Sequence, residues 1–555
     1  MSLVDAQELI RITEEACAAC DAYSLAAKRF VFERVADDVD GVMKIASERL
    51  QDEQRAVHGY AWVETTCEAL KAVSKWAQAL EARGQFGEPE QLATLIAFGE
   101  YLGQIVGGIP MGQNEIVRPV DLGTSVQAGQ LSENDSVQYF LTHGNIAANR
   151  KSLAAYLVDG RDLDDSFDDE LLDAIQAEYR RFTEQRIIPH AHEWHLNNDL
   201  VPDEIVQEMA DLGTFGVCIP EDFGGLGLGK LVMCVVTQEL SRGWIGAGSL
   251  GTRSEIAGEL ILTGGTAEQK SQWLPDIASG KVLPTAVFTE PDVGSDLGSL
   301  KTRAVKTPEG WSISGAKTWI THAARSDVMT LLARTDTETK GYGGLSMFLA
   351  PKARGTDEAL FPSDGMTGTE IEVLGYRGMR EYELAFDNFT IDDDALLGGT
   401  CGLGFKQLMA TFEGARIQTA ARAVGVAQRA YEVALAYAKE RKQFGKSIAV
   451  FPRVADKLSM MAVDILLSRE LTYFSAREKD KGRRCDIEAG MAKLFAARTA
   501  WSNADAGLQI HGGNGYALEY EISRLLCDAR ILNIFEGAAE IQAQVVARGN
   551  LMSAN

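Results

Sequence analysis

Residues 284–395 place the strongest constraint on the fold, because they carry β-type runs inside a chain that otherwise follows a helical period. After Leu403 the helical period returns, with stretches at 416–441 and 453–480 that are long enough to pair in a bundle. The pattern predicts a small β barrel or sandwich domain with helical domains before and after it in the sequence. Glycine and proline turns separate the β-type runs, which are residues 311–314, 328–333, 345–350 and 382–386.

The spacing of apolar residues in the N-terminal part of the chain predicts a separate helical region. Apolar residues recur at spacings of three and four through about residues 5–105. A stretch rich in glycine and proline, residues 107–134, then precedes a second helical pattern at 137–157. The acidic, polar run at 160–170 is typical of a linker. We therefore predict a domain boundary near residue 168.

Composition excludes several classes of protein. The chain has 555 residues and a formal net charge of -25, with 79 acidic residues against 54 lysines and arginines, which argues against a nucleic-acid-binding protein. The N-terminus lacks the basic and apolar regions of a secretory signal, and no apolar run approaches the ~18 residues of a membrane span. We expect a cytoplasmic protein that does not enter a membrane.

The eight cysteines are scattered through the chain, which favours reduced thiols over a disulfide framework. Cys17 and Cys20 have the spacing of a redox or metal motif, but they lie in an alanine-rich helical pattern without a second ligand pair. His190, His192 and His195 also suggest a metal cluster, and again no further ligands are spaced around them. Helix packing and a surface helix are the favoured interpretations, and we expect no metal.

Glu536 is the candidate catalytic base. The apolar residues before it, from Ile531 to Phe535, predict a poorly solvated carboxylate, and poor solvation raises a carboxylate pKa enough for proton abstraction from a weak carbon acid. Gly537 allows another group to approach closely. The alternative from this segment alone is an acidic residue in the first turn of a helix.

Two long motifs give the segment its context. The run from Gln509 to Tyr516, Gln-Ile-His-Gly-Gly-Asn-Gly-Tyr, is followed by Glu519, Arg524 and Asp528 and resembles the C-terminal signature of the acyl-CoA dehydrogenases. The run Phe-Thr-Glu-Pro-Asp-Val-Gly-Ser-Asp at 288–296 resembles a second signature of these flavoenzymes, which desaturate acyl thioesters. A third likeness is the Pro-Glu-x-x-Gly-Gly loop that begins at Pro220.

The resemblance extends from Leu171 to the C-terminus and implies a multidomain α+β protein with the acyl-CoA dehydrogenase fold. That fold has a helical domain, a middle β barrel or sandwich domain and a C-terminal four-helix bundle. Here an extra N-terminal helical domain precedes them. The boundaries that we expect are 1–168 for the extension and linker, 169–282 for the helical domain, 283–398 for the β domain and 399–555 for the bundle.

The resemblance also implies FAD, because no protein side chain can accept the β-hydride of an acyl thioester. Glu536 then abstracts the α-proton. An electron-transfer flavoprotein is the expected electron acceptor, with oxygen, as in an acyl-CoA oxidase, or a non-catalytic flavin scaffold as alternatives. The matching FAD positions are Phe288, Thr289, Ser295, Trp319 and Thr321, together with Arg441, Phe444, Gln509 and Gly513, which in the family reach FAD across a subunit interface.

The same resemblance implies contacts to the acyl-CoA substrate. Ser295, Phe412, Glu413 and Arg416 match substrate-binding positions, and Glu413 matches an acidic residue beside the pantetheine arm. Some relatives place the base on another helix, at the position that is Ala415 here, so that alternative base is missing. Two further departures from the family pattern are Glu381 and Ala538, where threonine is common.

The extension points to a member of the family that acts on a short branched or dicarboxylic acyl-CoA. A free carboxylate on the substrate needs a cationic partner in the acyl pocket, and Arg253 is the candidate. The alternative for Arg253 is a surface salt bridge to Glu255 or Glu259. Cations of the extension, such as Lys28 or Arg29, are another possible source. We expect a homo-oligomer, and the extension favours a dimer over the tetramer of many relatives.

Overall fold

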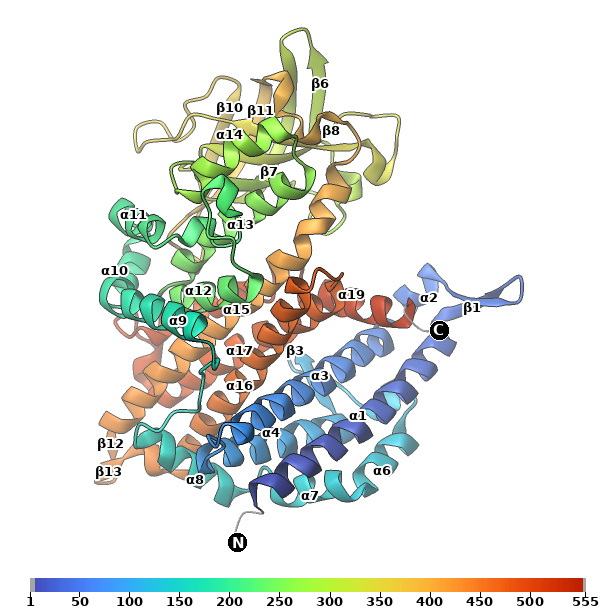
Figure 1. Cartoon of the computed structure of the whole chain (residues 1–555), viewed down its shortest axis with the longest axis vertical. Coiled ribbons are helices and arrows are strands. Elements are labelled where there is room, and N and C mark those ends of the chain that lie inside the picture. Colours follow the sequence, from blue (N-terminus) through green and yellow to red (C-terminus); the bar gives the residue numbers. More distant parts are fainter. Residues whose placement is uncertain (1–4, 553–555) are drawn as a thin grey trace. The chain divides into compact units, whose positions relative to one another are not determined.

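The computed structural model describes residues 5–552 and divides into two compact units (Figure 1). One unit contains residues 1–169 and 419–555, so the N-terminal extension and the C-terminal helices fold together. The other unit contains residues 170–418. Helix α15 (Gly404–Glu440) contributes residues to both.

The first unit is almost entirely helical. Its longest extension helix is α1 (Ala6–Val35), whose first turn is capped by the Asp5 carboxylate at 2.9 Å from the amide of Glu8. The remaining helices of at least eight residues in this unit, apart from its share of α15, are α3 (Gln54–Ala82), α4 (Glu88–Gly107), α6 (Ser125–Glu133), α7 (Asp135–His143), α8 (Ala147–Val158), α16 (Pro452–Asp480), α17 (Asp486–His511), α18 (Ile522–Ile531) and α19 (Ala539–Met552).

The extension packs against the C-terminal helices of its own unit. Helix α3 contacts α16, α17 and α19, and α8 lies along α16 (Figure 1). Polar contacts cross the same surface: the Tyr101 hydroxyl donates to Asp464 at 2.9 Å, and Arg150 pairs with Asp456 at 2.8 Å. Because apolar faces and ion pairs are both shared, the extension is an integral part of this helical unit.

The extension also contains short strands and short helices. Two hairpins, β1 (Ala36–Val39) with β2 (Val42–Ile45) and β3 (Ile109–Gly112) with β4 (Glu115–Val117), interrupt the helices. The second hairpin and α6 lie within residues 107–134, which the sequence predicted as a loop. Its glycines and prolines therefore mark tight turns between short elements rather than an unstructured connection. The extension also contains two short α-helices, α2 (Ser47–Asp52) and α5 (Pro119–Leu122).

The second unit combines a helical layer with a seven-stranded sheet. The strand order is β10-β11-β7-β6-β8-β5, with β9 paired to β8. Its helices of at least eight residues, apart from its share of α15, are α9 (Glu170–Phe182), α10 (Ile188–Asn197), α11 (Asp203–Asp211), α12 (Lys230–Gly243), α13 (Ile245–Gly264) and α14 (Ala267–Ala278). The strands are β5 (Pro284–Val287), β6 (Arg303–Thr307), β7 (Gly310–Thr321), β8 (Val328–Arg334), β9 (Leu345–Pro351), β10 (Met366–Ile371) and β11 (Glu381–Ile391).

The predicted fold class is confirmed: the β-type runs are strands, and helices precede and follow them. Helix α15 begins at Gly404, which agrees with the predicted return of the helical period after Leu403. Alternation of buried and exposed residues on β11 matches the period of a strand with one face in the core. No helix among residues 5–552 is long and apolar enough to cross a membrane.

Candidate active site

The loop that carries Glu536 lies between α18 and α19 and is joined to α17 by two hydrogen bonds. Glu536 has a positive φ of 52°, uncommon for a residue other than glycine, and Gly537 follows with φ 89°. The buried Lys493 on α17 donates to the Gly537 carbonyl at 2.6 Å. Asn533 donates to the Ala497 carbonyl at 3.1 Å. Such support from neighbouring helices fixes a strained backbone, as functional sites often require.

The Glu536 carboxylate forms an ion pair with Arg422 and accepts a hydrogen bond from the Thr419 hydroxyl. The Arg422 side chain is fully buried, whereas 15% of the Glu536 side chain is exposed. The sequence predicted an apolar surrounding for this carboxylate, and that prediction was wrong in part: Ile534 is 51% exposed, and a guanidinium is the immediate neighbour. The Arg422 guanidinium therefore orients the Glu536 carboxylate by a charge-assisted hydrogen bond.

Sequence reasoning missed both partners of Glu536. Thr419 and Arg422 lie three residues apart on α15, so they face the same side of that helix. Arg422 also places its guanidinium 4.9 Å from the centre of the Phe535 ring. Their spacing was readable in the sequence, but nothing in it indicated that this helix face meets the loop at 533–537.

The glycine motif follows directly after α17. The helix ends at His511, whose ring stacks on Tyr437 with centroids 4.1 Å apart. Gly512 has φ 62°, and a side chain at Gly513 would meet nothing within 4 Å. Gln509 is exposed beside this open backbone. The motif therefore presents unobstructed peptide groups, as close approach by a large ligand requires.

A short hairpin carries the predicted Arg441 and Phe444 positions. Strands β12 (Lys442–Gln443) and β13 (Lys446–Ser447) pair at the end of α15. Phe444 at the turn is 92% exposed and has φ 50°. Arg441 is exposed as well. An aromatic ring held in solvent on a strained turn is typical of a contact surface for a ligand or a second chain.

In the second unit, the predicted flavin positions Phe288 and Thr289 lie beside the end of β7, which carries Trp319 and Thr321. The amide of Thr318 donates to the Thr289 carbonyl at 3.0 Å, which joins the segment after β5 to this strand. Trp319 is 56% exposed with φ 57°. Ser295 is exposed beyond a turn in which Glu290 and Val293 exchange backbone hydrogen bonds of 2.9 and 3.0 Å. An exposed tryptophan on a rigid strand fits a planar ring such as a flavin.

Thr321 and Glu381 are paired at the same end of the sheet. The Thr321 hydroxyl donates to the Glu381 carboxylate at 3.0 Å, and the two residues also lie opposite each other on β7 and β11. Both are buried. Glu381, which departs from the family pattern, thus accepts a hydrogen bond from the hydroxyl of Thr321, a predicted flavin position.

Arg253 lies on α13, is 8% exposed and donates to the Tyr376 hydroxyl at 3.2 Å. Glu255 and Glu259, its predicted partners in a surface salt bridge, instead form ion pairs with Lys230, at 3.1 Å for Glu259. The surface interpretation of Arg253 is therefore wrong, because the side chain is buried. Tyr376 was not predicted, and its φ of 58° places it in a strained loop before β11.

The predicted substrate positions Phe412 and Arg416 lie on the part of α15 that belongs to the second unit. The Arg416 guanidinium is 5.8 Å from the centre of the Phe412 ring, and Arg416 is 7% exposed. Glu413 lies between them on the helix, less buried than Arg416. The three residues form one cationic, aromatic and acidic cluster.

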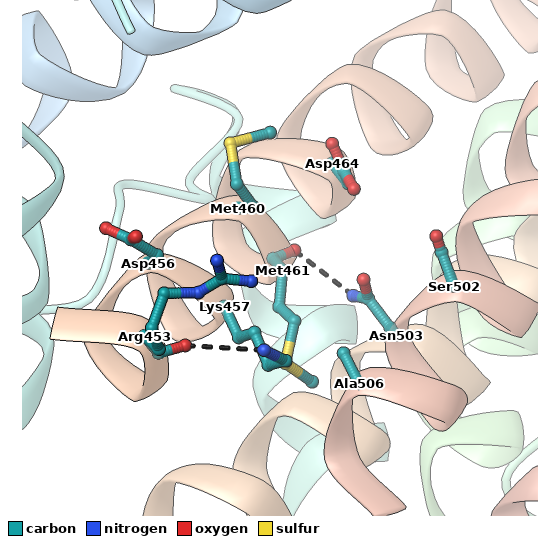
Figure 2. A pocket seen from close by; sticks show the side chains of 9 residues that line it. All are labelled: Arg453, Asp456, Lys457, Met460, Met461, Asp464, Ser502, Asn503 and Ala506. Carbon is teal, nitrogen blue, oxygen red and sulfur yellow. Dashed lines mark hydrogen bonds between the residues drawn. The ribbon is translucent and has the colours of Figure 1, made fainter. Parts of the chain in front are cut away.

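Other chemically suggestive residues do not form a site. All eight cysteines are free thiols. Within residues 5–552, no group of histidine, cysteine and acidic side chains could hold a metal ion. A cavity of about 230 Å³ lies between α16 and α17, lined by Arg453, Lys457 and Asn503 among others (Figure 2). Asn503 donates to the Met461 carbonyl at 3.1 Å there, and no predicted site residue lines this cavity.

Sequence models of three acyl-CoA dehydrogenase domains match the chain. The N-terminal domain matches residues 169–281, the middle domain residues 285–389 and the C-terminal domain residues 402–551. The chain belongs to the acyl-CoA dehydrogenase family, whose enzymes are FAD-dependent oxidoreductases.

Particular relatives refine this assignment. The chain is 58% identical to (2S)-methylsuccinyl-CoA dehydrogenase of Cereibacter sphaeroides over 98% of both chains. A solved glutaryl-CoA dehydrogenase of Mycobacterium smegmatis, in complex with FADH2, is 28% identical with a TM-score of 0.63 and covers 70% of this chain and 96% of its own. A structure from work on the electron transferring flavoprotein of Acidaminococcus fermentans is 30% identical with a TM-score of 0.65, covering 70% and 100%.

Proposed function

We propose that this protein catalyses the FAD-dependent α,β-dehydrogenation of (2S)-methylsuccinyl-CoA to mesaconyl-CoA, a step of the ethylmalonyl-CoA pathway. The observation that carries the proposal is the 58% identity over 98% of both chains. That match includes the N-terminal extension, whereas the solved neighbours above cover only about 70% of the chain. A relative that shares the extension as well as the dehydrogenase domains is the strongest guide to the substrate.

Glu536 removes the proton from the α-carbon of the thioester in this proposal. Its ion pair with Arg422 and the hydrogen bond from the Thr419 hydroxyl hold the carboxylate in place for this proton transfer. FAD, when bound, accepts the hydride from the β-carbon. The residues proposed to hold FAD are those named from the sequence: Phe288, Thr289, Ser295, Trp319, Thr321, Arg441, Phe444, Gln509 and Gly513.

The substrate is held by two groups of residues in the proposal. Phe412, Glu413 and Arg416, with Ser295, bind the CoA thioester. Arg253 pairs with the distal carboxylate, and its hydrogen bond to Tyr376 supports the role because it orients the guanidinium. Burial of Arg253 supports it further, since a desolvated cation pairs most strongly with a desolvated carboxylate.

The test is anaerobic bleaching of the purified yellow protein by a panel of acyl-CoA esters. We expect (2S)-methylsuccinyl-CoA to reduce the flavin fastest, with butyryl-CoA, isobutyryl-CoA and glutaryl-CoA slower by at least tenfold. Rapid bleaching by butyryl-CoA and none by methylsuccinyl-CoA would assign a different acyl substrate.

Arg422→Met should move the acidic limb of the kcat/KM profile to higher pH by about one unit, because loss of a neighbouring positive charge makes a carboxylate easier to protonate. The pH–rate profile with methylsuccinyl-CoA is the measurement. Thr419→Val is the comparison variant, since it removes a hydrogen bond to the carboxylate without removing a charge. An unchanged profile for Arg422→Met would show that this ion pair does not influence proton abstraction by Glu536.

The electron acceptor in the proposal is an electron-transfer flavoprotein. The family resemblance supports it, and oxygen is the competing acceptor. Reoxidation of the substrate-reduced protein should be at least tenfold faster with electron-transfer flavoprotein than with air-saturated buffer.

We place the reaction in the cytoplasm. The eight free thiols support this location, because thiols stay reduced there.

The assembled protein is a homodimer in this proposal. Many relatives pair two dimers into a tetramer, and here the extension covers faces of α16, α17 and α19. Light scattering on the full chain should give the mass of two 60.3 kDa subunits. A uniform tetramer mass would show that the extension leaves the pairing surface open.

A further inference from the structure

Lys317 on β7 is a buried ammonium with three acceptors. Its side chain is fully buried, and Nζ donates to the Phe288 carbonyl at 2.8 Å, the Leu332 carbonyl at 2.9 Å and the Glu290 carboxylate at 3.2 Å. An ammonium has three protons, so each has a partner. The cost of burying this charge is offset only while all three contacts persist.

These contacts hold one short segment from several sides. The carbonyl of Phe288 is bound by Lys317, and the carbonyl of Thr289 is bound by the neighbouring amide of Thr318 at 3.0 Å. Glu290 accepts from Lys317 and also from the amides of Lys301 and Thr302, both at 2.8 Å. Three consecutive residues after β5 are thereby tied to β7 and to the start of β6.

The orientation of the segment follows from these bonds. Because the carbonyls of Phe288 and Thr289 are both engaged by β7, the rotation of the peptide unit between them is fixed. An apolar side chain at position 317 would leave two buried carbonyls and a carboxylate oxygen without this donor, which is costly in a desolvated site. Burial lowers the pKa of Lys317 to about 8, and the neighbouring Glu290 carboxylate opposes this shift.

We propose that Lys317 is a positioning residue that sets the backbone of Phe288 and Thr289 for contact with the flavin ring. This inference rests on the proposed function, which assigns those two residues to FAD. Lys317 itself acts through the segment and does not touch the cofactor in this proposal.

Lys352 provides a matched control in the same unit. It is 8% exposed, and its Nζ donates to the carbonyls of Ala324, Ser326 and Ala353 at 3.1, 2.6 and 2.9 Å. Burial lowers its pKa to about 8 as well. It therefore shares the burial, charge and number of acceptors of Lys317 but binds a different part of the chain.

The experiment compares Lys317→Met with Lys352→Met in the full-length protein. FAD is removed and titrated back, and the dissociation constant is measured by quenching of flavin fluorescence, with the visible absorption spectrum recorded at saturation. We expect Lys317→Met to weaken FAD binding by at least tenfold and to shift the visible flavin bands. Lys352→Met should stay within about twofold with unchanged bands, although both variants lose stability toward urea.

Two results would overturn the proposal: FAD binding within twofold of the parent and unchanged flavin bands in Lys317→Met, or equal losses in the two variants. If Lys317→Met does not fold, Glu290→Gln supplies the same comparison, because it keeps the side-chain shape while removing the charge that Lys317 pairs with. Failure of the proposed function is distinct: the parent would bind FAD, yet methylsuccinyl-CoA would not bleach it.

Discussion

Glu536→Gln should bind FAD and acyl-CoA as the parent does but lose flavin reduction by substrate. Glutamine keeps the shape and the hydrogen bond from Thr419, whereas it cannot take a proton from the α-carbon. General bases contribute about 10²- to 10⁴-fold to rates, so the rate of anaerobic bleaching should fall by at least that factor. Stopped-flow absorbance of the flavin after mixing with methylsuccinyl-CoA measures it.

Glu540→Gln is the control for this variant. Glu540 is an exposed carboxylate in the first turn of α19, four residues from the proposed base. Its replacement changes the local charge by the same amount without touching the ion pair to Arg422. Bleaching by Glu536→Gln at a rate close to that of Glu540→Gln would remove Glu536 from the role of base.

The fold was readable from the sequence wherever periodicity was strong. Runs such as 328–333 and 345–350 became paired strands, and the stretch at 453–480 became α16 almost to the residue. Residues 107–134 were read less well, because a hairpin of three- and four-residue strands is too short to show a period of its own. Its glycines and prolines indicate turns in either arrangement.

In the candidate site, too, some residues could be predicted from the sequence and others could not. Glu536 and the positions around Trp319 were predicted from motifs in which several residues occur at fixed spacing, and their roles stay predictions. Arg422, Tyr376 and Lys317 were not found, since each acts on a residue that is distant in sequence: Arg422 meets Glu536 across 114 positions, and Arg253 meets Tyr376 across 123. Such pairings depend on tertiary packing, which local sequence patterns do not encode.

The surroundings of Glu536 differ from those that its neighbours in the sequence indicate. From the neighbouring residues alone, an apolar flank implied a carboxylate perturbed by desolvation. The structure instead places a buried guanidinium beside it. The two descriptions differ in kind, because the first surrounds the carboxylate with apolar groups and the second pairs it with a charge. A motif can therefore suggest a role for a residue without indicating which side chains surround it.

Arg253→Met should lower kcat/KM for methylsuccinyl-CoA by about two to three powers of ten. A dicarboxylic monothioester brings a negative charge into a site that excludes water, and the loss of a charged hydrogen bond there costs roughly 3–4 kcal/mol. Methionine keeps much of the length and the apolar packing of the arginine stem. Steady-state kinetics with methylsuccinyl-CoA and with a neutral branched acyl-CoA of similar size are compared in parent and variant.

The neutral substrate separates charge recognition from general damage. It has no carboxylate to pair with Arg253, so its kcat/KM should change by less than about tenfold, whereas disturbed folding or flavin binding would lower both substrates together. Tyr376→Phe removes the hydroxyl that receives the Arg253 hydrogen bond and keeps the guanidinium, so its loss should be smaller and confined to the same substrate. Equal losses for the two substrates in Arg253→Met, or no loss with methylsuccinyl-CoA, would remove Arg253 from this role. Cations of the extension, such as Lys28 or Arg29, would then be the next candidates.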